Sequence, residues 1–148
     1  MQEVVQTVMG TLGAVGISVL FNVRGRKLAA AGAGAALSWM VYLILYRIYG
    51  DKVISLFGAT LTAAVLSEIL ARVMKAPVII LLVPMLIPLL PGSDLYYTTT
   101  YMVRGNTAEF TAYLGLVMRE AGAIAFGIIL VTCAVQVILK IYRHFRYL

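Results

Sequence analysis

Charged residues are scarce in this sequence: they make up 12% of its 148 residues, whereas hydrophobic residues make up 62%. Soluble domains carry roughly a quarter charged residues and about half apolar ones. A soluble chain of this length cannot bury so much apolar surface. The long apolar runs therefore indicate an integral membrane protein of the all-α class, since the strands of a membrane β-barrel would alternate at every second residue.

Cysteine and histidine are almost absent. The single cysteine, Cys133, excludes an internal disulfide and a multi-cysteine metal site. The one histidine, His144, lies near the C-terminus, and the sequence contains no nucleophile–base pair and no phosphate-binding loop. We therefore expect neither an enzyme nor a metal site nor a cofactor. The N-terminal residues include Glu3 but no early Lys or Arg, so a cleaved signal peptide is not expected.

Positive charge dominates, with 12 Lys or Arg against 6 Asp or Glu. No basic run is interleaved with aromatic residues, so nucleic-acid binding is not expected. The charges lie instead at the ends of apolar runs, which is typical of membrane topology. We predict one transmembrane domain, residues 1–148, with about five spans in the lipid bilayer, the fourth broken by prolines. The predicted spans are 4–21, 28–46, 53–71, 78–93 and 121–140, and residues 94–118 are predicted to form an extracytoplasmic segment.

Basic residues form three clusters, at 24–27, at 72–75 and in the tail from Lys140. The positive-inside rule places all three clusters on the cytoplasmic side. Successive clusters must then be separated by an even number of crossings, so the proline-containing run has to cross the membrane. We therefore predict a multi-pass protein of the cytoplasmic membrane with its N-terminus outside and its C-terminus inside.

Proline is also scarce, and all four prolines fall between residues 77 and 91. Pro84 and Pro88 are four residues apart and share a helix face, and Pro91 with Gly92 forms a strong stop. A proline removes a backbone donor, and in lipid the freed carbonyl needs a partner inside the protein. The pattern predicts a discontinuous helix at a site that holds a polar solute. The alternative is a simple kink that fits the span to its neighbours.

Polar residues follow directly after the last proline. Gly92, Ser93 and Asp94 stand at the mouth of the predicted break, where Asp94 can contact an ion or a substrate ammonium group. Asp94 can equally cap the next helix, a position that favours Ser and Asp. The hydroxyls of residues 98–100, beginning with Thr98, can bind substrate or satisfy nearby backbone groups.

The pair Arg119 and Glu120 opens the last predicted span. Adjacent helix residues do not face each other, and an ionisable group inside a bilayer marks a pathway by default. Arg119 is predicted to hold a substrate carboxylate, and Glu120 is the candidate for a coupling proton if it is buried. The alternative is that both side chains lie at the outer boundary and reach into water. Glu68 is expected to pair with Arg72, four residues later.

The segment VPMLIPLLPGSDLYYTTTYMVRGN, residues 83–106, resembles the signature of the threonine/serine exporter family. The resemblance is to the smaller half-domain of that family. It rests on Val83-Pro84, on the run from Pro88 to Gly92, on Tyr96-Tyr97 and on the turn Arg104-Gly105-Asn106, in that order.

This resemblance implies secondary export of a small amino acid, or of a dicarboxylate such as succinate. It also implies a companion half-domain on a separate polypeptide, and a homo-oligomer is compatible with it. The candidate substrate-binding residues are Pro84, Pro88, Gly92, Ser93, Asp94, Thr98 and Arg119.

Two other functions stay open for the sequence. A structural or assembly subunit without its own substrate suits the small-residue stripe formed by Gly10, Gly13 and Gly16 equally well. A channel is also compatible, because a proline-broken span can serve a gate as well as alternating access.

Overall fold

Helices account for almost all of the chain. The computed structural model describes residues 2–146, and the side chains from 142 onward, which include most of the basic tail, lie outside that description. No strand occurs within the described range, so the all-α prediction is confirmed. The elements in chain order are α1 (Gln2–Leu20), α2 (Arg26–Tyr49), α3 (Lys52–Val73), α4 (Ile79–Leu86), the 3-10 turn η1 (Ile87–Leu89), α5 (Gly92–Val103) and α6 (Thr107–Arg146).

Helices α1, α2, α3 and α6 are each long and apolar enough to cross a membrane. A further candidate is the pair formed by Ile79–Leu89 and Gly92–Val103, which passes the same test as one unit but is bent by 63°. The described chain thus holds 4 candidate spans, or 5 if the bent pair is one span. This agrees with the predicted membrane protein whose fourth span is broken.

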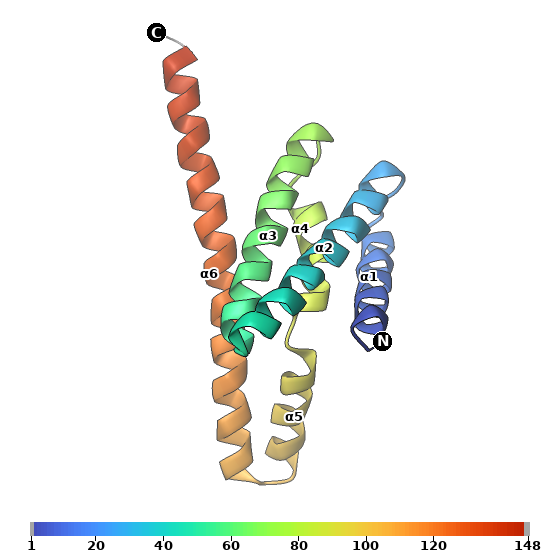
Figure 1. The fold of residues 1–148 in the computed structure, drawn as a ribbon, viewed down its shortest axis with the longest axis vertical. Coiled ribbons are helices and arrows are strands. Elements are labelled where there is room, and N and C mark those ends of the chain that lie inside the picture. Colours follow the sequence, from blue (N-terminus) through green and yellow to red (C-terminus); the bar gives the residue numbers. More distant parts are fainter. Residues whose placement is uncertain (1, 147–148) are drawn as a thin grey trace.

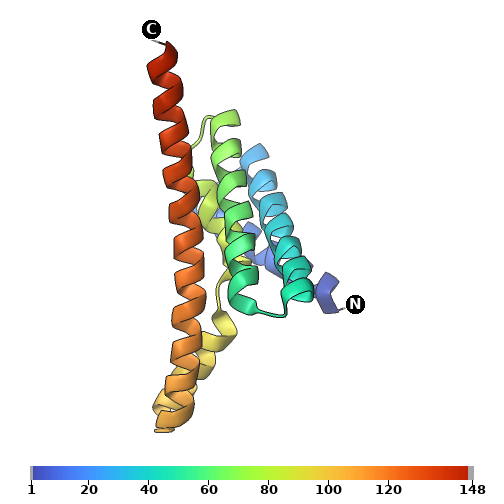
Figure 2. The same cartoon turned by 60° about the vertical axis from the view of Figure 1, so that its left-hand side comes forward.

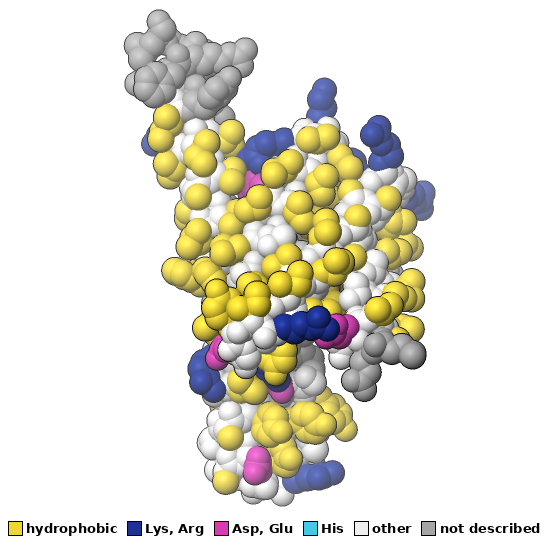
Figure 3. Space-filling view, viewed as in Figure 1, with side chains coloured by type: hydrophobic (Ala, Val, Ile, Leu, Met, Phe, Trp, Pro, Cys, Tyr) yellow, Lys and Arg dark blue, Asp and Glu magenta, His cyan; other side chains and the backbone are white. Residues whose placement is uncertain are grey.

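The helices are arranged in two parts (Figures 1 and 2). Helices α1 to α4 form a bundle whose α3 packs against the middle of α6, whereas α5 and the N-terminal part of α6 form an antiparallel hairpin that projects beyond the bundle. The α1–α2 and α3–α4 connections lie at the end of the molecule towards which α6 runs. We call this end, with Arg24, Arg26, Lys27, Arg72 and Lys75, the basic end; Figure 3 shows Lys and Arg side chains gathered there.

Small side chains fill the interior between α2, α3 and α4. Ala31, Ala59 and Ala63 are fully buried and pack with Leu81 and Met85 of α4. Lipid supplies no hydrophobic drive for helix association, so close packing of small residues is what holds such helices together. The alanine-rich start of α2 therefore forms a packing surface, as its composition suggests.

The proline break has a clear cause in backbone hydrogen bonding. Pro88 has no N–H to donate to the carbonyl of Pro84, and the N–H of Ile87 takes that acceptor instead. The backbone tightens into the 3-10 turn η1, in which Leu90 N–H donates to Ile87 at 3.4 Å. Pro91 then stands as the N-cap of α5, so the chain changes direction between η1 and α5.

Two caps position the start of α3. Gly50 has a left-handed conformation with φ 66°, which glycine adopts without steric cost, and its N–H donates to the carbonyl of Tyr46. Asp51 follows as the N-cap of α3, and its carboxylate accepts a hydrogen bond of 2.9 Å from Ile54 N–H. Lys52 is thereby the first residue of α3, at the end of the bundle opposite the basic end.

Helices α5 and α6, which flank the connection at residues 104–106, extend beyond the boundaries of the predicted fourth and fifth spans. Residues 94–118, predicted as an extracytoplasmic segment, form α5, a turn at Gly105 and the start of α6. Helix α6 begins at Thr107 and continues through the predicted span 121–140 without interruption. No membrane is present in the structure, so the bilayer boundaries along α6 stay predictions.

A glycine sets the distance between α3 and α6. A Cβ atom at Gly127 would lie 3.1 Å from Cγ2 of Thr60 and 3.5 Å from the carbonyl oxygen of Phe57. We expect Gly127→Leu to separate the helices and to lower the free energy of unfolding by about 1–3 kcal/mol. A lower thermal unfolding midpoint in detergent measures the effect.

Gly122 of the same helix provides the matched control. A Cβ atom there would meet nothing within 4 Å, so Gly122→Leu should leave the midpoint nearly unchanged. Equal midpoints for the two leucine variants would contradict the close approach of α3 and α6.

Candidate functional site

Charged side chains from three helices meet where the hairpin joins the bundle. Lys52 begins α3, Asp94 lies in the first turn of α5, and Glu120 lies within α6. The Nζ atom of Lys52 lies 3.0 Å from Oδ2 of Asp94 and 3.9 Å from Oε1 of Glu120. We call these three residues the Lys52 cluster. It brings two acidic groups to a single ammonium group.

The two acids of the Lys52 cluster are withdrawn from solvent. Asp94 is 6% exposed and Glu120 is 1% exposed, whereas the side chain of Lys52 keeps 41% of its surface accessible. Oε2 of Glu120 is buried without a hydrogen-bond partner among the described residues. A buried charge is costly unless it is paired, so the protonation of the two acids and the position of Lys52 are linked.

A hollow of about 320 Å³ opens beside the Lys52 cluster. The Arg119 side chain is exposed at this hollow and, unlike those of Lys52 and Asp94, takes no part in an ion pair among the described residues. A guanidinium group can bind a carboxylate through two parallel hydrogen bonds. The residues that line the hollow are Lys52, Asp94, Ala112, Tyr113, Leu116 and Arg119.

Stacked tyrosine rings extend from this hollow along the hairpin. The ring centroid of Tyr113 lies 5.4 Å from that of Tyr97 and 5.4 Å from that of Tyr101. The face of a tyrosine ring attracts cations, so Tyr113 offers a second kind of contact for an ammonium group. The hollow thus combines a free cation, an acid with its counter-ion, and an aromatic ring.

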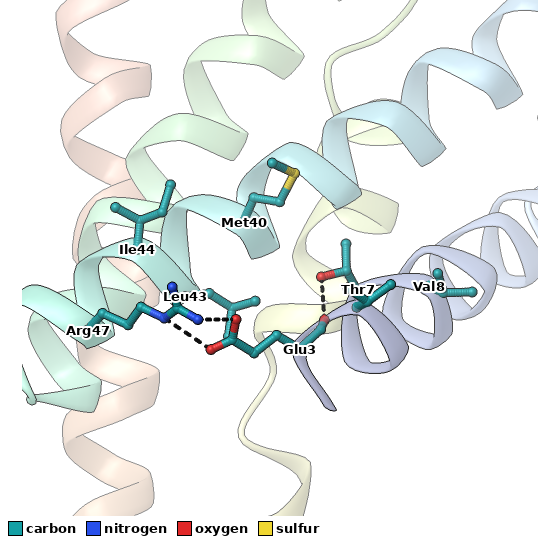
Figure 4. Close-up of a pocket in the computed structure, with 8 residues that line it drawn as sticks. Glu3, Thr7, Val8, Met40, Leu43, Ile44 and Arg47 are labelled. Atoms are coloured by element: carbon teal, nitrogen blue, oxygen red, sulfur yellow. Dashed lines mark hydrogen bonds and ion pairs between the residues drawn. The ribbon is translucent and has the colours of Figure 1, made fainter. Parts of the chain in front are cut away.

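A second hollow lies between α1 and α2, as Figure 4 shows. Its volume is about 340 Å³, and side chains such as Val4, Val8 and Met40 make its lining mainly apolar. Glu3 and Arg47 form an exposed ion pair there, with Nε of Arg47 donating at 3.1 Å. Because the charges neutralise each other and the remainder is apolar, this groove suits a hydrocarbon chain better than a polar solute.

Three of the predicted site residues come together in the structure: Asp94, Arg119 and Glu120. Two alternatives from the sequence are wrong. Asp94 does not cap α5, because Pro91 is the N-cap and the carboxylate of Asp94 faces Lys52 instead. Glu120 does not reach out to water, because it is packed inside the protein, whereas the neighbouring Arg119 side chain is exposed.

The other predicted residues lie outside the hollow. Pro84 is buried inside α4, and Pro88 lies in η1 against Gly10 of α1. Gly92 and Ser93 are exposed at the start of α5. The roles of Pro84, Pro88, Gly92 and Ser93 as substrate contacts stay predictions.

The threonines after the break serve their own helix. The hydroxyl of Thr98 donates to the carbonyl of Asp94 at 2.7 Å, and Thr99 and Thr100 do the same one and two residues later. These bonds match the alternative in which the threonine hydroxyls satisfy nearby backbone groups. Each hydroxyl oxygen can still accept a hydrogen bond from another group. The predicted pair of Glu68 and Arg72 is confirmed, with 2.6 Å between Oε2 and Nη1.

Lys52 is the site residue that the sequence analysis missed, because its short connector looks nearly balanced in charge. One signal was available. A cation at the first position of a helix is unfavourable beside the positive end of the helix dipole. Lys52 directly follows a capping aspartate, so its placement calls for an acidic partner from elsewhere in the chain.

Metal binding finds no support in the described residues, where no group of three His, Cys, Asp or Glu side chains is placed to hold a metal ion. The Lys52 cluster has two acids, and the ammonium group of Lys52 occupies the position between them. The charged groups of the Lys52 cluster and the exposed Arg119 can bind charged organic groups and exchange protons.

These features define a helical membrane protein with a polar site beside a broken span. Residues 6–134 match the family model described as Threonine/Serine exporter, ThrE. The chain therefore belongs to the threonine/serine exporter family, a family of transporters, as its proline-containing signature suggested. Neither the search of curated proteins nor the search of solved structures finds a significant match.

Labelling can test whether a substrate occupies the hollow. Ala112 lines it, and Ala108 lies one turn earlier on the same face of α6 but outside it. In a Cys133→Ala background, we expect bound threonine to slow the reaction of Ala112→Cys with a maleimide reagent. Ala108→Cys should react at the same rate with and without threonine. Equal protection of both positions would show a general change in accessibility and would contradict binding at the hollow.

Proposed function

We propose that this chain is the small subunit of a secondary transporter that exports a small amino acid, threonine or serine, across the cytoplasmic membrane. A companion half-domain subunit would complete the transporter. The observation that carries the proposal is the hollow at the broken span, which is lined by the ion pair of Lys52 and Asp94 and by Arg119, a residue without an ion-pair partner in the described part of the chain. Membership of the exporter family supplies the transport class.

The charges of the hollow suit a zwitterion. The α-carboxylate would bind Arg119, and the ammonium group would lie between Asp94 and the ring of Tyr113. A dicarboxylate such as succinate needs a second free cation, and Lys52 is already hydrogen-bonded to Asp94. We therefore favour the amino acid over the dicarboxylate as cargo.

Glu120 is our candidate for the coupling proton. Only one ammonium group serves both acids of the Lys52 cluster, so one acid is left without full compensation when both are ionised. A proton on Glu120 would leave Lys52 matched with Asp94 alone. Proton uptake and the arrangement of charges at the substrate site are then coupled within one cluster.

The proposed topology places the N-terminus outside and the C-terminus inside. The support is that the connectors of the basic end lie together at one end of the bundle. The Lys52 cluster would then lie towards the outer side. Ala112 and Arg119 leave one side of the hollow open, and we propose that the companion subunit contributes contacts there.

The alternative function is a structural or assembly subunit that binds no substrate. The glycines Gly16, Gly115 and Gly122 have open space where a side chain would be, so they can receive another helix. Such a subunit would tolerate neutral substitutions at the hollow as long as assembly persists.

Export of threonine by cells tests the site assignment. We expect Arg119→Ala and Asp94→Asn each to lower the export rate by roughly ten-fold or more, because each removes a charge-assisted contact. Arg104→Ala and Glu109→Gln are matched controls, since both residues are exposed on the hairpin away from the hollow. Wild-type export by the first two variants, at equal abundance in the membrane, would remove the assignment.

Co-expression tests the companion. We expect export above background only when this chain and a complementary half-domain of the same family are both present, because each supplies part of the site. Purification of the tagged chain should then retain the companion. Full export by this chain alone in reconstituted vesicles would contradict the two-subunit proposal.

A further inference from the structure

We propose that Lys52 is a positioning residue that latches α5 to the bundle through Asp94, and that transfer of Lys52 to Glu120 releases α5 to pivot about Leu90 and Pro91. The inference deepens the proposed function, because α5 carries one wall of the substrate hollow. The latch itself is a property of the protein that can be measured without transport.

The first observation is that α5 is attached to α6 but has few contacts with the helices α1 to α4. Among the described residues it packs against α6 and against no other helix, and it contributes no side chain to the hydrophobic core clusters. Its buried residues are Asp94 and Thr98. The described polar contact between α5 and the helices α1 to α4 is the 3.0 Å hydrogen bond from Lys52 to Asp94.

The second observation is a hinge beside this contact. Leu90 has an extended backbone and is 52% exposed, so it is not held by packing. Pro91 cannot donate a backbone bond, and the Gly92 N–H bonds only two residues back, to Leu90 at 2.8 Å. No helical hydrogen bond therefore crosses the 63° bend. A change of the Leu90 backbone dihedrals would move α5 without breaking helix bonds.

The third observation is a second acceptor within reach of Lys52. Oε1 of Glu120 lies 3.9 Å from Nζ of Lys52, and Oε2 has no hydrogen-bond partner within the described part of the chain. The side chain of Lys52 is long and has several rotatable bonds. A small rotation therefore moves its ammonium group from the carboxylate of Asp94 to that of Glu120. Glu120 lies on α6, which packs directly against α3, so its pairing with Lys52 does not require α5.

The charges around Glu120 determine the direction of the switch. The titratable and charged groups near Glu120 are Asp94 of α5, Lys52 of α3, the phenol of Tyr42 in α2 and the neighbouring Arg119 in α6, and Tyr113 lines the adjoining hollow. When Glu120 is neutral, Lys52 stays hydrogen-bonded to Asp94, and α5 stays docked against the bundle. An ionised Glu120 competes for Lys52, and Arg119 supports its negative charge. Acid therefore favours the docked arrangement and alkali favours release.

Pulsed EPR distances between α3 and α5 test the latch in the full chain reconstituted into lipid nanodiscs. Spin labels would be placed at the exposed Val65 and Met102 in a Cys133→Ala background. We expect a narrow distance distribution at acid pH that broadens as the pH rises. Glu120→Gln should stay narrow throughout, whereas Lys52→Met should be broad throughout.

Two further variants separate the latch from general effects of substitution. Lys52→Arg keeps the charge and should restore the narrow distribution, and Lys75→Met at the basic end should behave as the wild type does. A narrow distribution for Lys52→Met would overturn the latch. A pH response of Glu120→Gln equal to that of the wild type would overturn the role of Glu120.

The latch and the proposed function fail in different ways. If distances respond as expected but Arg119→Ala exports normally, the latch stands and the substrate site falls. If Arg119→Ala abolishes export while Lys52→Met leaves the distances unchanged, the substrate site stands and the latch falls.

Discussion

The structure depends on one constraint: within a membrane, each backbone polar group needs a partner inside the protein. Pro84, Pro88 and Pro91 lack the N–H groups that a regular helix needs to pair its carbonyl groups. The backbone in this segment forms the 3-10 turn η1 and a sharp bend instead of a continuous helix. The bend carries α5 away from the axis of α4. It therefore delivers Asp94 to a position that a straight helix would not reach, beside the start of α3.

The position of the Lys52 cluster follows from local rules at three helices. The left-handed Gly50 and the capping Asp51 place Lys52 at the first position of α3. The positive end of the helix dipole disfavours a cation there, so an acidic partner stabilises Lys52. The bend supplies Asp94, and the close packing of α3 on α6 at Gly127 places Glu120 nearby. The charge cluster is thus a consequence of backbone geometry, and in the proposed latch it converts a proton on one acid into a change of pairing at another.

The sequence predicted the architecture more fully than the site. Hydropathy and charge were enough for the helical class and the number of candidate spans, and the prolines located the break. The site was predicted in part, because Asp94 and Glu120 stand out as acids near apolar runs. Lys52 could not be found in this way, because its importance comes from a contact across 42 residues of sequence that only the fold creates. Thr98 stays a prediction as a substrate contact, and its hydroxyl donates within its own helix, an alternative that the sequence also left open.

Helix α5 packs on α6 but has few contacts with the helices α1 to α4, and this gives the proline break a second consequence besides the bend. Among the described residues, α5 leaves most of its surface uncovered and contributes no side chain to the core clusters. Transporters need an element that moves while the rest stays packed, and elements that move come from the least stable part of a fold. The alanine-rich packing of α2, α3 and α4 supplies the rigid part, whereas α5 packs on α6 and, in the proposed latch, is held to the bundle by an ion pair whose partner changes. The proposed latch therefore separates a rigid part from a moving part at Leu90 and Pro91, next to the charges that a zwitterion would meet.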